Sequence, residues 1–311
     1  MTVPRRCFSL NVFDKFTKLL GKEEPSSPLA LLVPLQSRGS KPPFFWIHGE
    51  YSDAVLPHYL GRDQPLYGLW HQSADGKPAQ YTTVQDIAAH YVSEIRTVQP
   101  HGPYFLGGYC FGAILSFEMA QQLRKEGEEV ALLVLLNPSH FTATGHNRVS
   151  QARAGGPGVR RHLHGFRLLE SEEKLPYIVE RVKGKVDGAV MKVSAINKKM
   201  LQRIAWNVCL AFGCNLPVAL RSPYILKVYR RAMRSYVPEI YPGRLIIFQA
   251  SEDSRDLQDW GNWAAGGVDI RDVPGGHENV LKEPHVQVWA ERLKSCLQTA
   301  QAQIPQQTRW K

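Results

Sequence analysis

A buried strand that turns sharply into a helix is the feature that most constrains the fold of this chain. The segment PYFLGG (103–108) is apolar, Cys110 follows between Gly108 and Gly112, and residues 112–126 have helical spacing. Glycines on both sides of the turn allow the strand and helix backbones to pass almost in contact, which a side chain would prevent. The segment predicts one strand–helix unit of an α/β protein, with a thiol at the apex of the turn.

The same alternation of strand and helix recurs along the chain. A helix is predicted at 84–98 and a closing helix at 284–300, and the expected strands are PFFWI (43–47), VALLVLL (130–136), RLIIFQA (244–250) and VDIRDV (268–273). VALLVLL is apolar on both faces, which is typical of a parallel strand covered by helices on each side. We therefore expect the α/β class, with a mostly parallel sheet and helices on both of its faces.

The alternation stops between residues 138 and 239, where helix formers dominate and no strong strand pattern occurs. We interpret this stretch as a helical lid inserted into an α/β core made of residues 33–137 and 240–300. Residues 1–32 are expected to form an amphipathic helix and a linker, and residues 301–311 a C-terminal tail.

The positive charge is concentrated in the predicted insertion. The 311-residue chain has a net charge of +10, whereas residues 138–239 contain eighteen Lys and Arg against six Asp and Glu. Such a segment is either a solvated helical surface or a docking surface for an acidic macromolecule or a phosphorylated ligand. We find no helix-turn-helix, zinc-finger or RNA-binding signature, so nucleic acid is not an expected partner.

The number of cysteines and the hydropathy of the sequence indicate where in the cell the protein is expected to function. Five cysteines in a chain of this length do not indicate a disulfide framework, so we expect a reducing, cytoplasmic location. The longest apolar run is Val130–Leu136, far shorter than the roughly 20 residues that a membrane-spanning helix needs. We expect no membrane span, no metal site and no resident cofactor.

The chemistry of the turn points to a nucleophile. The helix after Cys110 directs its N-terminus at the thiol, and the backbone N–H of Phe111 is in position to donate to an oxyanion. Both effects favour a thiolate. This arrangement is the nucleophile elbow of the α/β-hydrolases with sulfur in place of oxygen. The competing interpretation is a buried small residue after an ordinary strand–helix turn.

A nucleophilic thiol needs a base and an orienting partner, and in this fold class the chain order is nucleophile, acid, histidine. His277 follows the last strand through a Gly-Gly turn, where that order requires the base. Two residues compete to orient it. Asn137 ends the strand 130–136 and carries no charge, which a Cys–His pair tolerates because a thiol ionises more readily than a hydroxyl. Asp253 follows the strand 244–250, the more usual position of a hydrolase acid.

Several segments resemble the thioesterase domain found at the end of nonribosomal peptide and polyketide synthases, in a cysteine-nucleophile variant like those fused to adenylating enzymes and carrier domains. The segments are VPLQSRGSKPPFFWIHG, QPLYGL, DIAAHYVSEIRTVQPHGPYFLGGYCFG, FEMAQQLRKEGEEVALLVLL, YPGRLIIFQAS and GGVDIRDVPGGHENVLKEPHV. The resemblance covers about residues 33–137 and resumes near residue 241, and it matches the predicted insertion only loosely.

The resemblance implies an α/β-hydrolase fold and acyl transfer from a phosphopantetheine thioester. The family's nucleophile falls on Cys110, its acid on Asn137 and its histidine on His277. Two departures coincide, because most members have serine and aspartate at the first two positions. The family's oxyanion loop here lacks glycines after Gly49, so Glu50 or Tyr51 would supply the second oxyanion donor beside Phe111.

The resulting expectation is a thioesterase or acyltransferase that forms an acyl-cysteine with a Cys–His–Asn triad. Its substrate is an acyl group on a carrier protein or on coenzyme A, and the acceptor is water, an amine or an alcohol. The alternative is a catalytically degenerate hydrolase scaffold that binds a carrier protein or a hydrophobic ligand. The missing glycines and the uncharged Asn137 motivate that alternative, and it predicts an unreactive Cys110 thiol.

Overall fold

The structure of the chain is a computed structural model that describes residues 31–49, 52, 55–73, 75–139, 200–209, 211, 214–253 and 257–304. The predicted N-terminal helix and the oxyanion candidates Glu50 and Tyr51 lie outside the described residues. The chain divides into two compact units, residues 1–142 with 215–311, and residues 143–214. Residues 215–239, which the sequence assigned to the insertion, therefore belong to the unit that contains the sheet.

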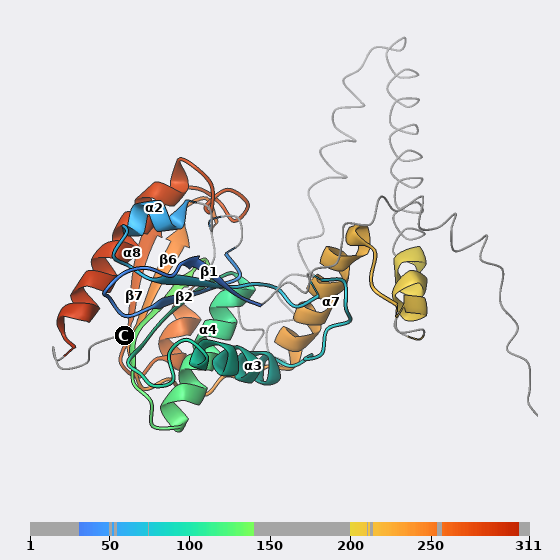
Figure 1. The fold of residues 1–311 in the computed structure, drawn as a ribbon, viewed down its shortest axis with the longest axis horizontal. Coiled ribbons are helices and arrows are strands. Elements are labelled where there is room, and N and C mark those ends of the chain that lie inside the picture. Colours follow the sequence, from blue (N-terminus) through green and yellow to red (C-terminus); the bar gives the residue numbers. More distant parts are fainter. Residues whose placement is uncertain are drawn as a thin grey trace, which may run out of the picture. The chain divides into compact units, whose positions relative to one another are not determined.

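The sheet has seven strands in the order β1-β3-β2-β4-β5-β6-β7 (Figure 1). Only β1 and β3 pair in antiparallel fashion, and every other neighbouring pair is parallel. The strands are β1 (Leu32–Gln36), β2 (Phe44–Ile47), β3 (Leu66–Leu69), β4 (Tyr104–Tyr109), β5 (Val130–Leu136), β6 (Leu245–Ala250) and β7 (Val268–Val273). The predicted class, a mostly parallel sheet within an α/β protein, is confirmed.

Helices cover both faces of this sheet and bury two separate apolar cores (Figure 1). On one face lie α3 (Val84–Arg96), α4 (Phe111–Lys125) and α7 (Val218–Ser235), and on the other lie α2 (Leu56–Leu60) and α8 (His285–Ala302). A short 3₁₀ helix, η1 (Gln258–Trp263), joins the first core through Trp260. Because β2, β4 and β5 have helices on both sides, their residues are almost all buried, which explains their continuous apolar sequences.

The strand β1, at one edge of the sheet, and its neighbour β3 are the strands that the sequence pattern did not predict. Each has only four or five residues, β1 contains Pro34 and β3 contains Gly68. Proline is tolerated on a sheet edge because its missing N–H costs no inner ladder bond, and glycine weakens strand propensity. Neither segment therefore has the long apolar run that identifies β5.

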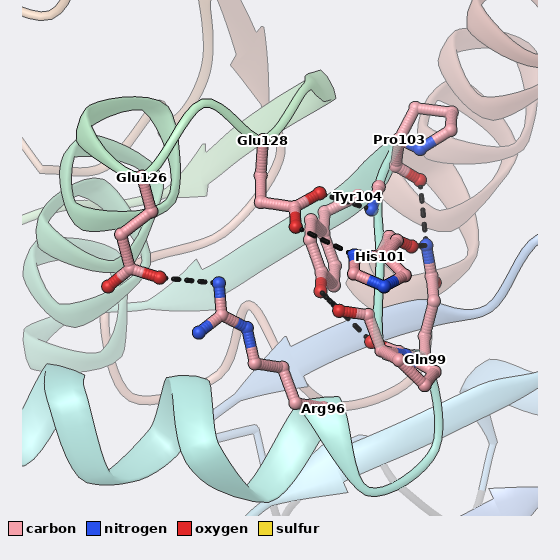
Figure 2. Close-up of polar contacts among 9 residues, drawn as sticks. Arg96, Gln99, His101, Pro103, Tyr104, Glu126 and Glu128 are labelled. Atoms are coloured by element: carbon pink, nitrogen blue, oxygen red, sulfur yellow. Dashed lines mark hydrogen bonds and ion pairs between the residues drawn. The ribbon is translucent and has the colours of Figure 1, made fainter.

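A polar network anchors the beginning of β4, at the opposite end of the strand from Cys110 (Figure 2). The Glu128 carboxylate accepts a hydrogen bond from the Gly102 backbone N–H at 2.7 Å and lies 3.0 Å from Nδ1 of His101. The Gln99 side chain donates to the backbone carbonyls of His101 and Pro103, and the Tyr104 hydroxyl donates to the carbonyl of Gln99. These bonds hold the strand that presents the nucleophile.

A buried hydrogen-bonded pair ties the chain after α7 to the helix that follows the elbow. The Tyr236 hydroxyl donates to the Glu118 carboxylate at 2.7 Å, and the Gln121 amide donates to the Tyr236 hydroxyl at 3.2 Å. Burial, together with the neighbouring Glu118 carboxylate, raises the pKa of Tyr236, so the phenol stays protonated and remains a donor. The end of α7 is thereby fixed on α4.

Candidate active site

The elbow between β4 and α4 holds Cys110 in a backbone conformation that non-glycine residues rarely adopt. Its φ is 55° and its ψ is −111°. The flanking glycines are required by contact. A Cβ on Gly108 would lie 2.3 Å from the carbonyl oxygen of Gly112, and a Cβ on Gly112 would lie 2.3 Å from the carbonyl oxygen of Ile47. The elbow therefore depends on bare backbone at both positions, as its glycine pattern indicates.

The elbow places Cys110 directly before the first turn of α4. Phe111 begins this 15-residue helix, so its N–H is among the four at the N-terminus that have no acceptor within the helix. These N–H groups and the helix dipole favour negative charge at the N-terminal end. The Phe111 ring stacks on Tyr229 of α7 with centroids 4.4 Å apart, which packs the first residue of α4 against the helix that follows the insertion.

The predicted partners of Cys110 converge at the carboxyl edge of the sheet. Asn137 follows β5, the strand paired with β4, and its backbone N–H donates to the Phe248 carbonyl at 2.7 Å. The Asn137 side chain is fully buried. Its Nδ2 atom lies 2.7 Å from Oδ2 of Asp253 and 2.9 Å from Nδ1 of His277. The structure thus places Asn137 between Asp253 and His277. Of the two residues predicted to orient the histidine, Asn137 contacts it, and Asp253 contacts Asn137.

His277 is held by its backbone as well as by its ring. It follows β7 at the same edge of the sheet, and the Tyr109 hydroxyl donates a hydrogen bond to its carbonyl oxygen. The rings of Tyr109 and His277 lie with centroids 5.1 Å apart. Because Tyr109 directly precedes Cys110, this contact joins the nucleophile elbow to the histidine loop. The roles of Cys110, His277 and Asn137 in catalysis remain predictions.

Ser139 is a candidate site residue that the sequence reasoning missed. Its Oγ lies 3.4 Å from Sγ of Cys110, and its backbone N–H donates to the Cys110 carbonyl at 3.3 Å. A hydroxyl at this distance is in position to donate to a thiolate and so stabilise it. The available signal was its place two residues after Asn137, at the end of the strand adjacent to the elbow.

A cluster of buried rings lies beside Phe111, in the region of the predicted oxyanion loop. His48 directly follows β2 and has a φ of 58°, and its ring lies 3.9 Å from that of His71 and 5.3 Å from that of Tyr229. The Tyr91 hydroxyl donates to the Trp70 carbonyl, so it accepts from Nε2 of His48 at 2.9 Å. Burial lowers the pKa of His48 well below its usual value and lowers that of His71 to about 4.

The low pKa of His71 makes stability depend on pH in a defined direction. Between about pH 6.5 and about pH 4 the unfolded chain binds a proton at this residue and the folded chain does not, so the free energy of unfolding decreases as the pH is lowered. We expect a loss of about 3 kcal/mol across this window from His71. Urea unfolding between pH 7 and 4 should show a smaller loss in His71→Phe than in the wild type. The exposed control His101→Gln should follow the wild type, and parallel curves for all three proteins would contradict the prediction.

The described residues contain no group of three or more His, Cys, Asp or Glu side chains placed to hold a metal ion. Within those same ranges, no helix combines the length and the apolar character needed to cross a membrane.

Comparisons with curated proteins find synthases and synthetases, one of which is named a nonribosomal peptide synthase. The chain is 42% identical over 121 residues to a dimodular nonribosomal peptide synthase of Bacillus subtilis, which covers 37% of this chain and 5% of that protein. It is 29% identical over 282 residues to chondramide synthase cmdD of Chondromyces crocatus, covering 86% of this chain and 7% of that protein. It is 30% identical over 305 residues to the inactive atromentin synthetase invA6 of Paxillus involutus, covering 92% of this chain and 29% of that protein. The chain spans less than a third of the length of each.

Solved structures show the same fold. The NocB thioesterase domain, in covalent complex with a fluorophosphonate nocardicin G analog, superposes with a TM-score of 0.54 at 20% identity, covering 86% of this chain and 100% of that chain. The four-domain nonribosomal peptide synthetase AB3403 superposes with a TM-score of 0.54 at 19% identity, covering 89% of this chain and 20% of that chain. These similarities confirm the predicted α/β-hydrolase fold.

A family model described as the thioesterase domain matches residues 56–296, which include the elbow, Asn137, Asp253 and His277. This match extends over most of the chain and agrees with both the fold and the resemblance in sequence. The protein therefore belongs to the thioesterase domain family.

Proposed function

We propose that this chain cleaves an acyl thioester through a covalent acyl-cysteine on Cys110. One observation carries the proposal: a thiol stands at the strained elbow where the family's nucleophile is expected, at the N-terminus of α4 and 3.4 Å from the Ser139 hydroxyl. The ionised form of a thiol is the nucleophilic one. His277 and Asn137 lie at the same edge of the sheet and are the proposed base and orienting residue.

The proposed reaction proceeds in two halves. In the first, His277 takes the proton of Cys110, Sγ bonds to the thioester carbonyl carbon, and the bond from that carbon to the substrate sulfur breaks. The Phe111 N–H, with Glu50 or Tyr51 as the second donor, stabilises the oxyanion, and His277 returns the proton to the departing thiol. In the second half, water, an amine or an alcohol attacks the acyl-cysteine and releases Cys110.

A thiol nucleophile accounts for the uncharged residue at position 137. Serine needs a strong base to ionise, which a carboxylate beside the histidine helps to supply. A thiol ionises at much lower pH, so an amide that only orients the ring is sufficient. Exchange between two thiols is nearly thermoneutral, so the acyl-cysteine keeps the transfer potential of the substrate and can pass the acyl group to more than one class of acceptor.

The proposed substrate is an acyl group on the phosphopantetheine of a carrier protein, or on coenzyme A. Membership of a family found in multidomain synthetases supports a carrier-bound substrate. The excess of Lys and Arg between residues 138 and 239 fits a phosphate-bearing or acidic partner. The few cysteines support a reducing, cytoplasmic setting, and the proposal requires no resident cofactor.

Intact-mass spectrometry with acyl-phosphopantetheine and acyl-coenzyme A thioesters tests this proposal. We expect the wild type to gain the mass of the acyl group and Cys110→Ala to gain none. Cys214→Ala is the matched control, because Cys214 is another partly buried thiol outside the candidate site, and it should form the adduct normally. An adduct that persists in Cys110→Ala would show that Cys110 is not the nucleophile.

The uncharged Asn137 and a relative named an inactive synthetase favour a second candidate, a scaffold that binds a carrier protein or hydrophobic ligand without turnover. It predicts that Cys110 alkylates as slowly as an ordinary thiol. Rapid labelling of Cys110 by iodoacetamide at pH 6 would exclude this candidate and support the first.

A further inference from the structure

One atom of Asn137 contacts both of its titratable neighbours. Nδ2 lies 2.7 Å from Oδ2 of Asp253 and 2.9 Å from Nδ1 of His277. An ionised carboxylate only accepts hydrogen bonds, so the amide atom that faces Asp253 must be the nitrogen. The same nitrogen then donates its second hydrogen to His277. Nδ1 of His277 must therefore be an acceptor, and the neutral ring carries its hydrogen on Nε2.

Asp253 is the group that selects this orientation of the amide. The other end of the amide, Oδ1 of Asn137, is buried and has no hydrogen-bond partner among the described residues, so nothing there opposes Asp253. Asp253 itself is held by its backbone, because its N–H donates to the Ala250 carbonyl at 3.0 Å and its carbonyl accepts from the Gln249 side chain at 3.0 Å. The carboxylate is thus presented to Asn137 by the end of β6.

This tautomer is the wrong one for a base. A ring with its hydrogen on Nε2 has no lone pair there to accept a proton from Cys110. If the ring became doubly protonated, its Nδ1–H would face the N–H of Asn137, which places two donors against each other. Proton transfer from Cys110 to His277 therefore requires the Asn137 amide to turn over, so that Oδ1 accepts from Nδ1–H. Turning it over places Oδ1 against the Asp253 carboxylate, which is repulsive.

We propose that Asp253 is a positioning residue that acts through Asn137 and holds His277 in the tautomer that does not accept the Cys110 proton. This inference rests on the proposed function, and it gives Asp253 the opposite effect from an acid that contacts the histidine directly. Two outcomes follow. Neutralising Asp253 should make Cys110 more reactive, and exchanging the two residues should place a carboxylate directly against Nδ1–H.

The test uses the full chain and three variants. Asp253→Asn leaves a side chain that can donate to the turned-over Oδ1 of Asn137. The exchange Asn137→Asp with Asp253→Asn keeps the net charge. Glu252→Gln is the matched control, because Glu252 is exposed and its carboxylate lies beside Gly276, so it removes a nearby negative charge without contacting Asn137. The rate of iodoacetamide labelling at Cys110 is measured from pH 5 to 9 by peptide mass spectrometry, and circular dichroism monitors folding.

We expect Cys110 of Asp253→Asn to label about tenfold faster than that of the wild type at pH 7. Without the carboxylate, the Asn137 amide can turn over, and its N–H then no longer opposes Nδ1–H of protonated His277. The double variant Asn137→Asp with Asp253→Asn should label at least as fast as Asp253→Asn. The rate for Glu252→Gln should stay within about twofold of the wild-type rate. A rate for folded Asp253→Asn that is unchanged or lower would overturn the inference, since a directly orienting acid predicts a loss.

A second measurement reads the tautomer in the wild type itself, so it does not depend on how the Asp253 variants fold. In chain labelled with ¹⁵N-histidine, with His277 assigned by the signals lost in His277→Gln, the two ring nitrogens report which one carries the hydrogen. We expect Nε2–H in the wild type at pH 7, and finding Nδ1–H instead would overturn the inference. The proposed function is tested separately. If no acyl adduct forms on Cys110, the proposed function is wrong, even if His277 carries its hydrogen on Nε2. If an adduct forms but His277 carries its hydrogen on Nδ1, only the inference about Asp253 is wrong.

Discussion

Replacing His277 by alanine is expected to lower the rate at which Cys110 is acylated by about a thousandfold. The loss is this large because the nucleophile and its base act as a unit, so removing the base leaves only orientation and oxyanion stabilisation. His277 lies beside Asn137 at the carboxyl edge of the sheet, and Tyr109, which directly precedes Cys110, contacts its backbone. Single-turnover acylation with an acyl-phosphopantetheine thioester measures the rate.

The control for this variant is His101→Ala. The His101 side chain is 85% exposed and lies at the beginning of β4, whereas Cys110 follows the other end of that strand. Its loss should leave the acylation rate within about twofold of the wild type. If His277→Ala acylates less than tenfold more slowly than the wild type while remaining folded, another group is the base.

Placing a methyl group on Gly108 is expected to destabilise the sheet-containing unit by about 3 kcal/mol or more. A Cβ there would lie 2.3 Å from the Gly112 carbonyl oxygen and 2.4 Å from Oγ of Ser116. The first of these atoms belongs to the backbone of the elbow, so no change of rotamer relieves the overlap. A loss of this size corresponds to a melting temperature roughly 10 °C lower for a unit of about 200 residues.

Gly261→Ala is the matched control for Gly108→Ala. A Cβ on Gly261 would meet no heavy atom within 4 Å, and its φ is outside the range that strains other residues. Its melting temperature should stay within about 2 °C of the wild type. Thermal unfolding followed by circular dichroism compares the melting temperatures of the two variants. Equal melting temperatures would contradict the prediction, because they would mean that the strand and helix can move apart at little cost in stability.

The sequence predicted the elements whose pattern is local and strong. The strand 130–136 agrees residue for residue with β5, and the elbow follows from Gly108 and Gly112 because steric crowding between a strand and its own helix is a short-range property. The strands β1 and β3 were missed, because strands of four or five residues are too short to show a clear periodicity. The insertion at 138–239 stays a prediction, and α7, which lies within that range, packs on the first core through Tyr229 and Ile225.

In the candidate site, too, some residues could be identified from the sequence, whereas others required the tertiary structure. The glycine-flanked turn selected Cys110, the chain order selected His277, and the position of Asn137 at the end of a strand made it a candidate. Sequence reasoning left Asn137 and Asp253 as alternatives, because nothing local shows that residues 116 positions apart share a hydrogen bond. Ser139 was missed for a similar reason, since its contact with Cys110 depends on how the ends of β4 and β5 are aligned.

By itself, the sequence determined the class of fold, the family and a thiol at the apex of a cramped turn, since each of these depends on residue type and short-range backbone geometry. Only the tertiary structure decided that a single amide nitrogen stands between a carboxylate and the histidine. The physical reason is that adjacent parallel strands bring their carboxyl ends to one edge of the sheet, where side chains from distant parts of the chain meet.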